Sequence, residues 1–321
     1  MKKLLDLLRD LFRNAASACW ELYKVMIPII IGVRILQEFD LIQYLAWPLR
    51  PVMGLVGLPA EMGLAWATAM VNNIYSGLIV FLSLIKDTPL TTAQATVLGV
   101  LFLVAHGLPV ESSIARKAGS RFLFQCLSRI IGALCLGWLL HTIYTAAGTL
   151  EQPAVVLFQA SAQTETSLTT WALGELRNLL GIFGIVFCLM ALMRLLHALR
   201  IVDLLNAILR PVLKLIGIGP KASAITVIGL TLGLTYGGGL IISEAKSGTV
   251  GRQDVFYSLT LMGLCHSLIE DTLLLALIGA HFSGIFWGRF GFSIMAVAVL
   301  VQIVRKLPEK FCDKYLWGDP A

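Results

Sequence analysis

The second half of the chain repeats the first half at a constant spacing of 160 residues, so that His106 is matched by His266 and Glu111 by Asp271. The other matches are Arg34 with Arg194, Leu49-Arg50-Pro51 with Leu209-Arg210-Pro211, Gly57 with Gly217, Ser83 with Ser243, Lys86 with Lys246, Gly119 with Gly279, and Arg129 with Arg289. Chance similarity between two leucine-rich stretches would match leucines, whereas these matches fall on rare residue types and need no gap. The sequence therefore predicts a duplication of one structural unit.

The composition indicates that both copies lie in a lipid bilayer. Of the 321 residues, 57% are hydrophobic and only 14% are charged, and the mean hydropathy is +0.83. These values are typical of membrane proteins and not of soluble domains. The net charge of +6 comes from basic residues scattered over short loops and tails, so nucleic acid is not an expected partner. The prediction is an all-α polytopic membrane protein whose main partner is the bilayer.

The apolar runs predict about six transmembrane helices and two re-entrant hairpins. Runs long enough to cross about 30 Å of hydrocarbon are residues 18–37, 62–85 and 122–147 in the first copy and 173–199, 222–243 and 284–304 in the second. The runs 93–105 and 253–265 would span only about 20 Å as helices. We expect them to re-enter and turn back, with a full crossing as the alternative. The N-terminal residues and two segments ending in Leu-Arg-Pro are predicted interfacial amphipathic helices.

Basic residues predict the orientation, because Lys and Arg favour the cytoplasmic side of a membrane. Both chain ends and the segment around Arg116 are basic, whereas the central loop has no Lys or Arg and carries Glu151 and Glu165. Both termini are thus predicted to be cytoplasmic, in a bacterial cytoplasmic (inner) membrane, with the two copies inverted. With re-entrant arms, Lys246 and Arg252 fall outside as exceptions. The predicted divisions are an N-terminal helix 1–17, a first repeat 18–147, an extracytoplasmic linker 148–172, a second repeat 173–305 and a cytoplasmic tail 306–321.

Two matched motifs, HGLPVES at 106–112 and HSLIEDT at 266–272, are predicted to meet near the middle of the membrane. Ionisable residues are costly in hydrocarbon and by default mark a functional pathway. We therefore expect one substrate-binding site that includes His106, Glu111, Ser112, His266, Ser267, Glu270 and Asp271. Imidazole and carboxylate groups suit Mn, Zn, Fe or Ni, so His106, Glu111, His266, Glu270 and Asp271 are also a candidate metal-ligand set.

A second irregularity interrupts the middle apolar run of each copy. VNNIYSG at 71–77 and LTYGGG at 234–239 contain poor helix formers, and broken helices expose backbone dipoles to a solute. The predicted solute contacts are Asn72, Asn73, Tyr75, Ser76, Thr235, Tyr236 and Gly237. Close helix packing by the glycines and hydrogen bonds from the asparagines to a neighbouring helix are the alternative explanations. The arginines inside apolar runs are predicted to snorkel or to hold a hairpin by pairing with an acid; these are Arg34, Arg129, Arg194 and Arg289.

The duplicated arrangement, the IYSG and TYGGG breaks and the two histidine motifs resemble the Gate, or nucleoside-recognition, domain family of integral membrane proteins. That family includes spore maturation proteins A and B and is related to the membrane part of ferrous-iron permeases, and its repeat layout is similar to that of concentrative nucleoside transporters. The resemblance covers residues 20–305 and implies hairpins and broken helices around a midplane site. The ferrous-iron permeases use pore cysteines, whereas here Cys265 is matched by Ala105 in the first copy.

These observations predict a permease that moves a small polar solute or a divalent metal ion by alternating access. A nucleoside-type transporter coupled to protons or sodium is one alternative, and a non-transporting scaffold of a larger membrane complex is another. An enzyme is not expected, because the sequence has no nucleophile elbow and no HExxH motif. No cofactor is expected beyond a divalent metal as substrate or coupling ion, and homo-oligomerisation is left open. The six cysteines form no CxxC pair, and most of them are predicted to be free thiols.

Overall fold

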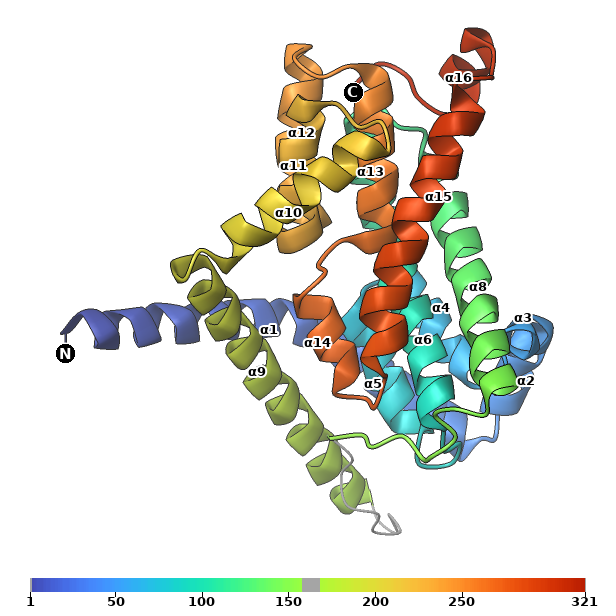
Figure 1. The fold of residues 1–321 in the computed structure, drawn as a ribbon. Coiled ribbons are helices and arrows are strands. Elements are labelled where there is room, and N and C mark those ends of the chain that lie inside the picture. Colours follow the sequence, from blue (N-terminus) through green and yellow to red (C-terminus); the bar gives the residue numbers. More distant parts are fainter. Residues whose placement is uncertain (1, 158–167, 321) are drawn as a thin grey trace.

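The computed structural model describes residues 2–157 and 168–320, and in these ranges all regular secondary structure is helical (Figure 1). The prediction of an all-α polytopic membrane protein is confirmed. Within the described ranges, five helical segments are long and apolar enough to cross a bilayer, namely Thr92–Lys117, Phe122–Ala147, Leu168–Leu196, Arg252–Ala276 and Ser283–Val304. Three of the runs predicted to be spans are not among the five. Two of these, 62–85 and 222–243, turn back on themselves, and the third is 18–37.

The N-terminal segment is one continuous helix, α1 (Lys2–Glu38), with no break near residue 17, where we expected an interfacial helix to end. It crosses α9 (Leu168–Ala198) at one side of the structure (Figure 1). The Tyr23 hydroxyl donates a hydrogen bond of 2.6 Å to the carbonyl of Leu179, and Met26 and Ile182 belong to a small buried apolar cluster between the helices. The first helices of the two copies therefore pack on each other.

The Leu-Arg-Pro motifs lead into the same turn in both copies. The first lies across a 3-10 helix (Trp47–Leu49) and α3 (Arg50–Leu55), after the short α2 (Ile42–Ala46); the second lies in α10 (Ile201–Leu215). Gly57 (φ 71°) and Gly217 (φ 95°) follow them in the left-handed region that favours glycine. The residue after this glycine is Leu58 in the first copy and Ile218 in the second. Its amide donates a hydrogen bond to the carbonyl five residues earlier.

The predicted middle spans are helical hairpins. In the first copy α4 (Met62–Val71) and α5 (Ile74–Leu84) pack so closely that a Cβ added to Gly77 would lie 2.5 Å from the Cβ of Ala69. In the second copy α11 (Pro220–Leu232) and α12 (Leu234–Ser247) are likewise separated only by Gly233, at φ 90°. The prediction that 62–85 and 222–243 cross the membrane in one pass is therefore wrong. Each segment forms two short helices, and the second runs back alongside the first.

The predicted re-entrant arms instead pass from one end of the structure to the other. In the first copy α6 (Thr92–Val104) is followed by α7 (Leu108–Lys117). The Thr92 amide donates to the carbonyl of Gln152, beyond the C-terminus of α8 (Phe122–Ala147), whereas the Arg121 amide at the other end of α8 donates to Leu316. Because α8 has 26 residues, these ends are about 39 Å apart. The prediction of a re-entrant hairpin here is wrong.

The second copy makes the same broken crossing with α13 (Arg252–Cys265) and α14 (Glu270–Ala276). Its start lies beside the C-terminal tail, where Arg252 forms an ion pair with Asp319. Its end leads to His281, whose amide donates 2.8 Å to the hydroxyl of Thr96 near the start of α6. Thus α6 and α13 start at opposite ends and run in opposite directions, as do α8 and the last long helix, formed by a π-helical turn (Ser283–Gly288) and α15 (Arg289–Val304) (Figure 1).

Basic side chains from several segments gather at one end of the structure, which we call the basic end. It holds the start of α8, the start of α13 and the terminal helix α16 (Glu309–Tyr315), with Arg121 donating to the carbonyl of Asp313 at 2.5 Å. Lys246 lies in the last turn of α12 at this end, and Arg252 is beside it in sequence. Lys246 and Arg252 therefore lie with the other basic residues and are not exceptions to the charge rule. Arg116 and Lys246, expected on opposite sides of the membrane, lie at the same end of the structure. Residues 148–157 lie at the other end, the linker end; residues 158–167 of the predicted linker fall outside the described chain.

Candidate binding site

Two histidines stand at the breaks of the two crossing helices. His106 and His266 directly follow the last turns of α6 and α13, and Gly107 (φ 56°) and Ser267 (φ 46°) after them are both left-handed, which bends the chain without reversing it. The Nδ1 atom of His106 lies 2.7 Å from the carbonyl oxygen of Phe102, and that of His266 lies 2.9 Å from Met262. A carbonyl only accepts hydrogen bonds, so each Nδ1 carries the ring proton.

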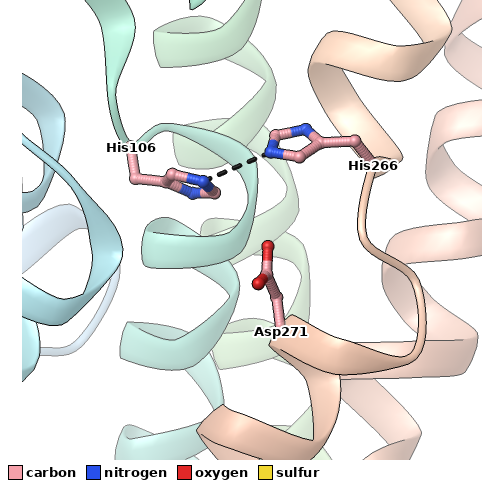
Figure 2. A group of neighbouring side chains, drawn as sticks. All are labelled: His106, His266 and Asp271. Atoms are coloured by element: carbon pink, nitrogen blue, oxygen red, sulfur yellow. Dashed lines mark hydrogen bonds between the residues drawn. The ribbon is translucent and has the colours of Figure 1, made fainter. Parts of the chain in front are cut away.

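The second ring nitrogens of the two histidines face each other. The Nε2 atoms lie 3.2 Å apart, and the rings are 6% and 2% exposed (Figure 2). With the protons on Nδ1, both neutral Nε2 atoms present lone pairs. Two lone pairs at hydrogen-bond distance repel, so this contact is favourable when a proton or another cation lies between them. This arrangement can hold a proton or another cation at the contact of the two copies.

Carboxylates from both copies lie next to the histidine pair. The Oε1 atom of Glu111 is 3.4 Å from the Nε2 atoms of both His106 and His266, and its Oε2 is 2.5 Å from Nη1 of Arg129. Asp271 is 8% exposed, and its carboxylate and the two imidazoles have ligand atoms within 4.8 Å of one another. Figure 2 shows the Asp271 carboxylate pointing toward the pair. A carboxyl group thus reaches the two rings from each copy.

Two buried arginines hold the ends of the broken helices. Arg129 donates through Nε to the carbonyl of Val104 at 2.8 Å and through Nη2 to that of His106 at 2.7 Å. Arg289 donates in the same way to Leu264 at 3.1 Å and to His266. These carbonyls lose their helical partners at the breaks, so the guanidinium groups fix the histidine backbones. The predicted pairing of an arginine with an acid is found for Arg129.

The hairpin tips touch the same breaks. The Gly107 amide donates 2.8 Å to the carbonyl of Ala69 near the end of α4, and the Leu268 amide donates 2.8 Å to Leu230 near the end of α11. Hairpins from opposite ends of the structure therefore reach the two histidines from either side. This places the predicted interruptions near the site, although each interruption is a chain reversal and not a break within a span.

The polar groups at the first tip bond mainly to each other. Asn73 caps α5 by accepting 2.9 Å from the Ser76 amide, and the Asn72 side-chain amide donates 2.5 Å to the Ser76 hydroxyl. Tyr75 is half-buried and packs against the apolar core. Solute binding by these residues stays a prediction. Thr235, Tyr236 and Gly237 lie in the first turn of α12, and their side chains are outside the described part of the chain.

The structure brings together four of the predicted site residues, namely His106, Glu111, His266 and Asp271. Ser112 is buried and accepts from the Cys126 thiol, whereas the Ser267 hydroxyl faces Gly233 at the second tip. Glu270 is half-buried in the first turn of α14, and it does not belong to the group of His106, His266 and Asp271 whose ligand atoms lie within 4.8 Å of one another. The sequence analysis missed the carbonyls of Phe102 and Met262. The spacing of four residues to each histidine, the helical repeat, is the signal that could have found them.

Comparisons with known proteins agree with the membrane assignment. The chain matches no family model and no solved structure. It is similar to the uncharacterized membrane protein YvoD of Bacillus subtilis (strain 168), with 28% identity over 266 residues, which cover 81% of this chain and 83% of that protein. Together with the long apolar helices of the described chain, this similarity identifies the chain as a multi-pass membrane protein.

Proposed function

We propose that the chain is a permease that moves a small polar solute or a divalent metal ion by alternating access. The observation that carries this proposal is the buried contact between His106 and His266, with Glu111 bridging them. Buried ionisable groups at the junction of two copies are expensive in a membrane and typical of transport pathways. The proposed site lies where broken helices and hairpin tips from opposite directions meet, as in many secondary transporters.

The two hairpins supply the proposed gates. The α4–α5 hairpin reaches the site from the linker end and the α11–α12 hairpin reaches it from the basic end. Each tip is joined to the break beside a histidine by one backbone hydrogen bond, at Gly107 or at Leu268. Withdrawal of one tip would open the site to one side while the other tip keeps it closed. Alternation between these two states is the proposed transport cycle.

The proposed location is a bacterial cytoplasmic membrane with the basic end inside. Lys and Arg favour the cytoplasmic side, and the basic end carries Arg116, Arg121, Lys246, Arg252 and Arg305. The C-terminal helix α16 lies at that end, so the C-terminus is cytoplasmic in this proposal. The basic N-terminal residues of the sequence favour the same side for the N-terminus.

The second candidate is a nucleoside-type transporter coupled to protons or sodium. It is supported by the resemblance to the Gate domain family and by two facing histidines, since imidazole is the side chain that most readily exchanges protons near neutral pH. We do not propose an enzyme. A scaffold of a larger membrane complex would leave the buried histidine and acid cluster without a role.

Flux measurements test the permease proposal. The purified chain, reconstituted in liposomes, should move at least one member of a panel of divalent metals, nucleosides and small polar solutes. The variant His266→Ala should lose this flux, because it removes half of the histidine pair. The matched control is His281→Ala, which changes an exposed histidine at the linker end. Wild-type liposomes that move none of the panel would overturn the proposal in favour of the scaffold.

A further inference from the structure

Three donor atoms at the centre of the site have the mutual spacing of ligands on one metal ion. The Nε2 atoms of His106 and His266 are 3.2 Å apart, and Oε1 of Glu111 is 3.4 Å from each. Zinc-type ions form bonds of about 2.0 to 2.1 Å to such atoms in tetrahedral sites, which sets the ligand atoms about 3.3 Å apart. The three atoms therefore outline one face of a tetrahedron of the right size.

The Nδ1 atoms of the two histidines make the hydrogen bonds that are typical of metal-binding histidines. A ligating histidine usually donates its other ring N–H to a backbone carbonyl or carboxylate, which fixes the ring and leaves the lone pair toward the metal. Here Phe102 and Met262 provide those carbonyls. Arg129 binds Oε2 of Glu111 and leaves Oε1 facing the rings. The support around the three donors is therefore already in place.

The charge and the size of the site select the kind of ion. Asp271 offers a further carboxylate to the imidazole pair, while Glu111 shares its charge with Arg129, so two carboxylate groups face one cation. Imidazole favours first-row transition metals and zinc over calcium and magnesium, which prefer oxygen ligands. The donor atoms are within 3.4 Å of one another, which suits a single ion and leaves no space among them for a nucleobase.

We infer that His106, His266 and Glu111 bind one divalent ion of the zinc or first-row transition-metal class at the contact of the two copies, with Asp271 as the fourth ligand. This inference deepens the proposed function and rests on it only for the role of the ion as cargo or coupling ion. Metal binding is inferred from the spacing of the donor atoms alone and does not depend on transport.

Equilibrium titration of the full-length, tag-free chain in detergent tests the inference. Calorimetry with Zn²⁺ should give one ion per chain, and Co²⁺ should give the visible absorption of a tetrahedral complex. His106→Ala and His266→Ala should each weaken binding by at least about 100-fold, since loss of even a supporting residue costs 10- to 100-fold. Two controls, His281→Ala and Cys265→Ser, should leave the affinity unchanged, and Ca²⁺ should not compete.

Thermal unfolding keeps the inference testable when a variant is unstable. A bound ion raises the unfolding temperature by mass action, so Zn²⁺ should stabilise the wild type and the two controls but neither histidine variant. A folded wild type that takes up no ion, or histidine variants that retain full affinity, would overturn the inference. Metal binding without flux of any solute would support the metal site and contradict the permease function. Flux of an organic solute without metal binding would support the permease function and contradict the metal site.

Discussion

Arg129 and Arg289 bind the same two carbonyl groups in their respective copies, but their remaining nitrogens have different surroundings. Nη1 of Arg129 pairs with Glu111 at 2.5 Å. Nη1 of Arg289 is buried and has no hydrogen-bond partner among the described residues. The residue matching Glu111 is Asp271, whose side chain is one methylene shorter. The two copies thus share a backbone arrangement and differ in how their buried guanidinium groups are neutralised.

This asymmetry predicts opposite effects of exchanging the two acids. Asp271→Glu should stabilise the protein, because the longer carboxylate can reach Nη1 of Arg289, and a hydrogen bond to a charged group contributes about 1.5 to 3 kcal/mol. Glu111→Asp should destabilise it by a similar amount, since Arg129 would lose its partner. Unfolding temperatures in detergent with a chelator present would measure both, free of metal effects. A destabilising Asp271→Glu substitution would contradict this account.

Removal of the Glu111 charge should be more damaging than removal of the Asp271 charge. Glu111→Gln leaves the guanidinium group of Arg129 buried without its counter-charge, and breaking a buried ion pair from one side costs about 3 to 5 kcal/mol. Asp271→Asn breaks no ion pair of the described structure and should cost less. The same unfolding assay compares the two variants. Equal losses of stability would show that the ion pair of Glu111 with Arg129 does not account for the loss in Glu111→Gln.

The two histidines and the acids beside them could be picked out from the sequence, whereas the path of the chain toward them could not, and the solute contacts expected at the hairpin tips stay predictions. His106 and His266 stand out because ionisable residues are rare in apolar runs, and the repeat places them at matched positions. An apolar run such as residues 62–85 fits equally well as one membrane span or as two short arms. Packing decides between these, and packing depends on contacts such as Ala69 with Gly77 that hydropathy does not contain.

The charges could have corrected the predicted path. Lys246 and Arg252 fell on the wrong side only because the arms at 93–105 and 253–265 were taken to turn back. When these arms cross and the middle runs turn back instead, both residues join the basic end. The prediction from length was wrong because a single 13-residue helix is too short to cross the membrane. In the structure a second helix, α7, follows α6 after Gly107 and continues in the same direction, so the two together complete the crossing.

The first hairpin should depend on the absence of a side chain at residue 77. A Cβ added at Gly77 would lie 2.5 Å from the Cβ of Ala69 and 2.9 Å from the carbonyl oxygen of Ala65. Gly77→Ala should therefore force the arms apart and cost about 1 to 3 kcal/mol. Gly184→Ala is the matched control, because nothing lies within 4 Å of its added Cβ and alanine favours the helix. Thermal unfolding should separate the two variants, and equal stability would contradict the hairpin.

Ser267 occupies a backbone conformation that its matched residue, Gly107, adopts at less cost. Its φ is 46°, in the left-handed region where a residue with a Cβ is strained. Ser267→Gly should stabilise the protein by about 1 kcal/mol, whereas the control Ser243→Gly, on the exposed face of α12, should lower helix stability. Chemical denaturation of both variants would test this. A loss of stability for Ser267→Gly would mean that its hydroxyl contributes more than the strain costs.

Sidedness labelling tests the path of the whole chain through the membrane. In a background with the six native cysteines replaced, single substitutions Arg116→Cys and Lys246→Cys place thiols on exposed residues at the basic end, and Glu151→Cys places one at the linker end. Because basic residues favour the cytoplasm, an impermeant maleimide should label residue 151 in intact cells and residues 116 and 246 only after permeabilisation. Labelling of 116 and 246 from opposite sides would restore re-entrant arms at 93–105 and 253–265. Under that result the two histidines would stand at the turns of re-entrant hairpins and not at breaks in crossing helices. The proposed gates on either side of the site would then be ruled out as well.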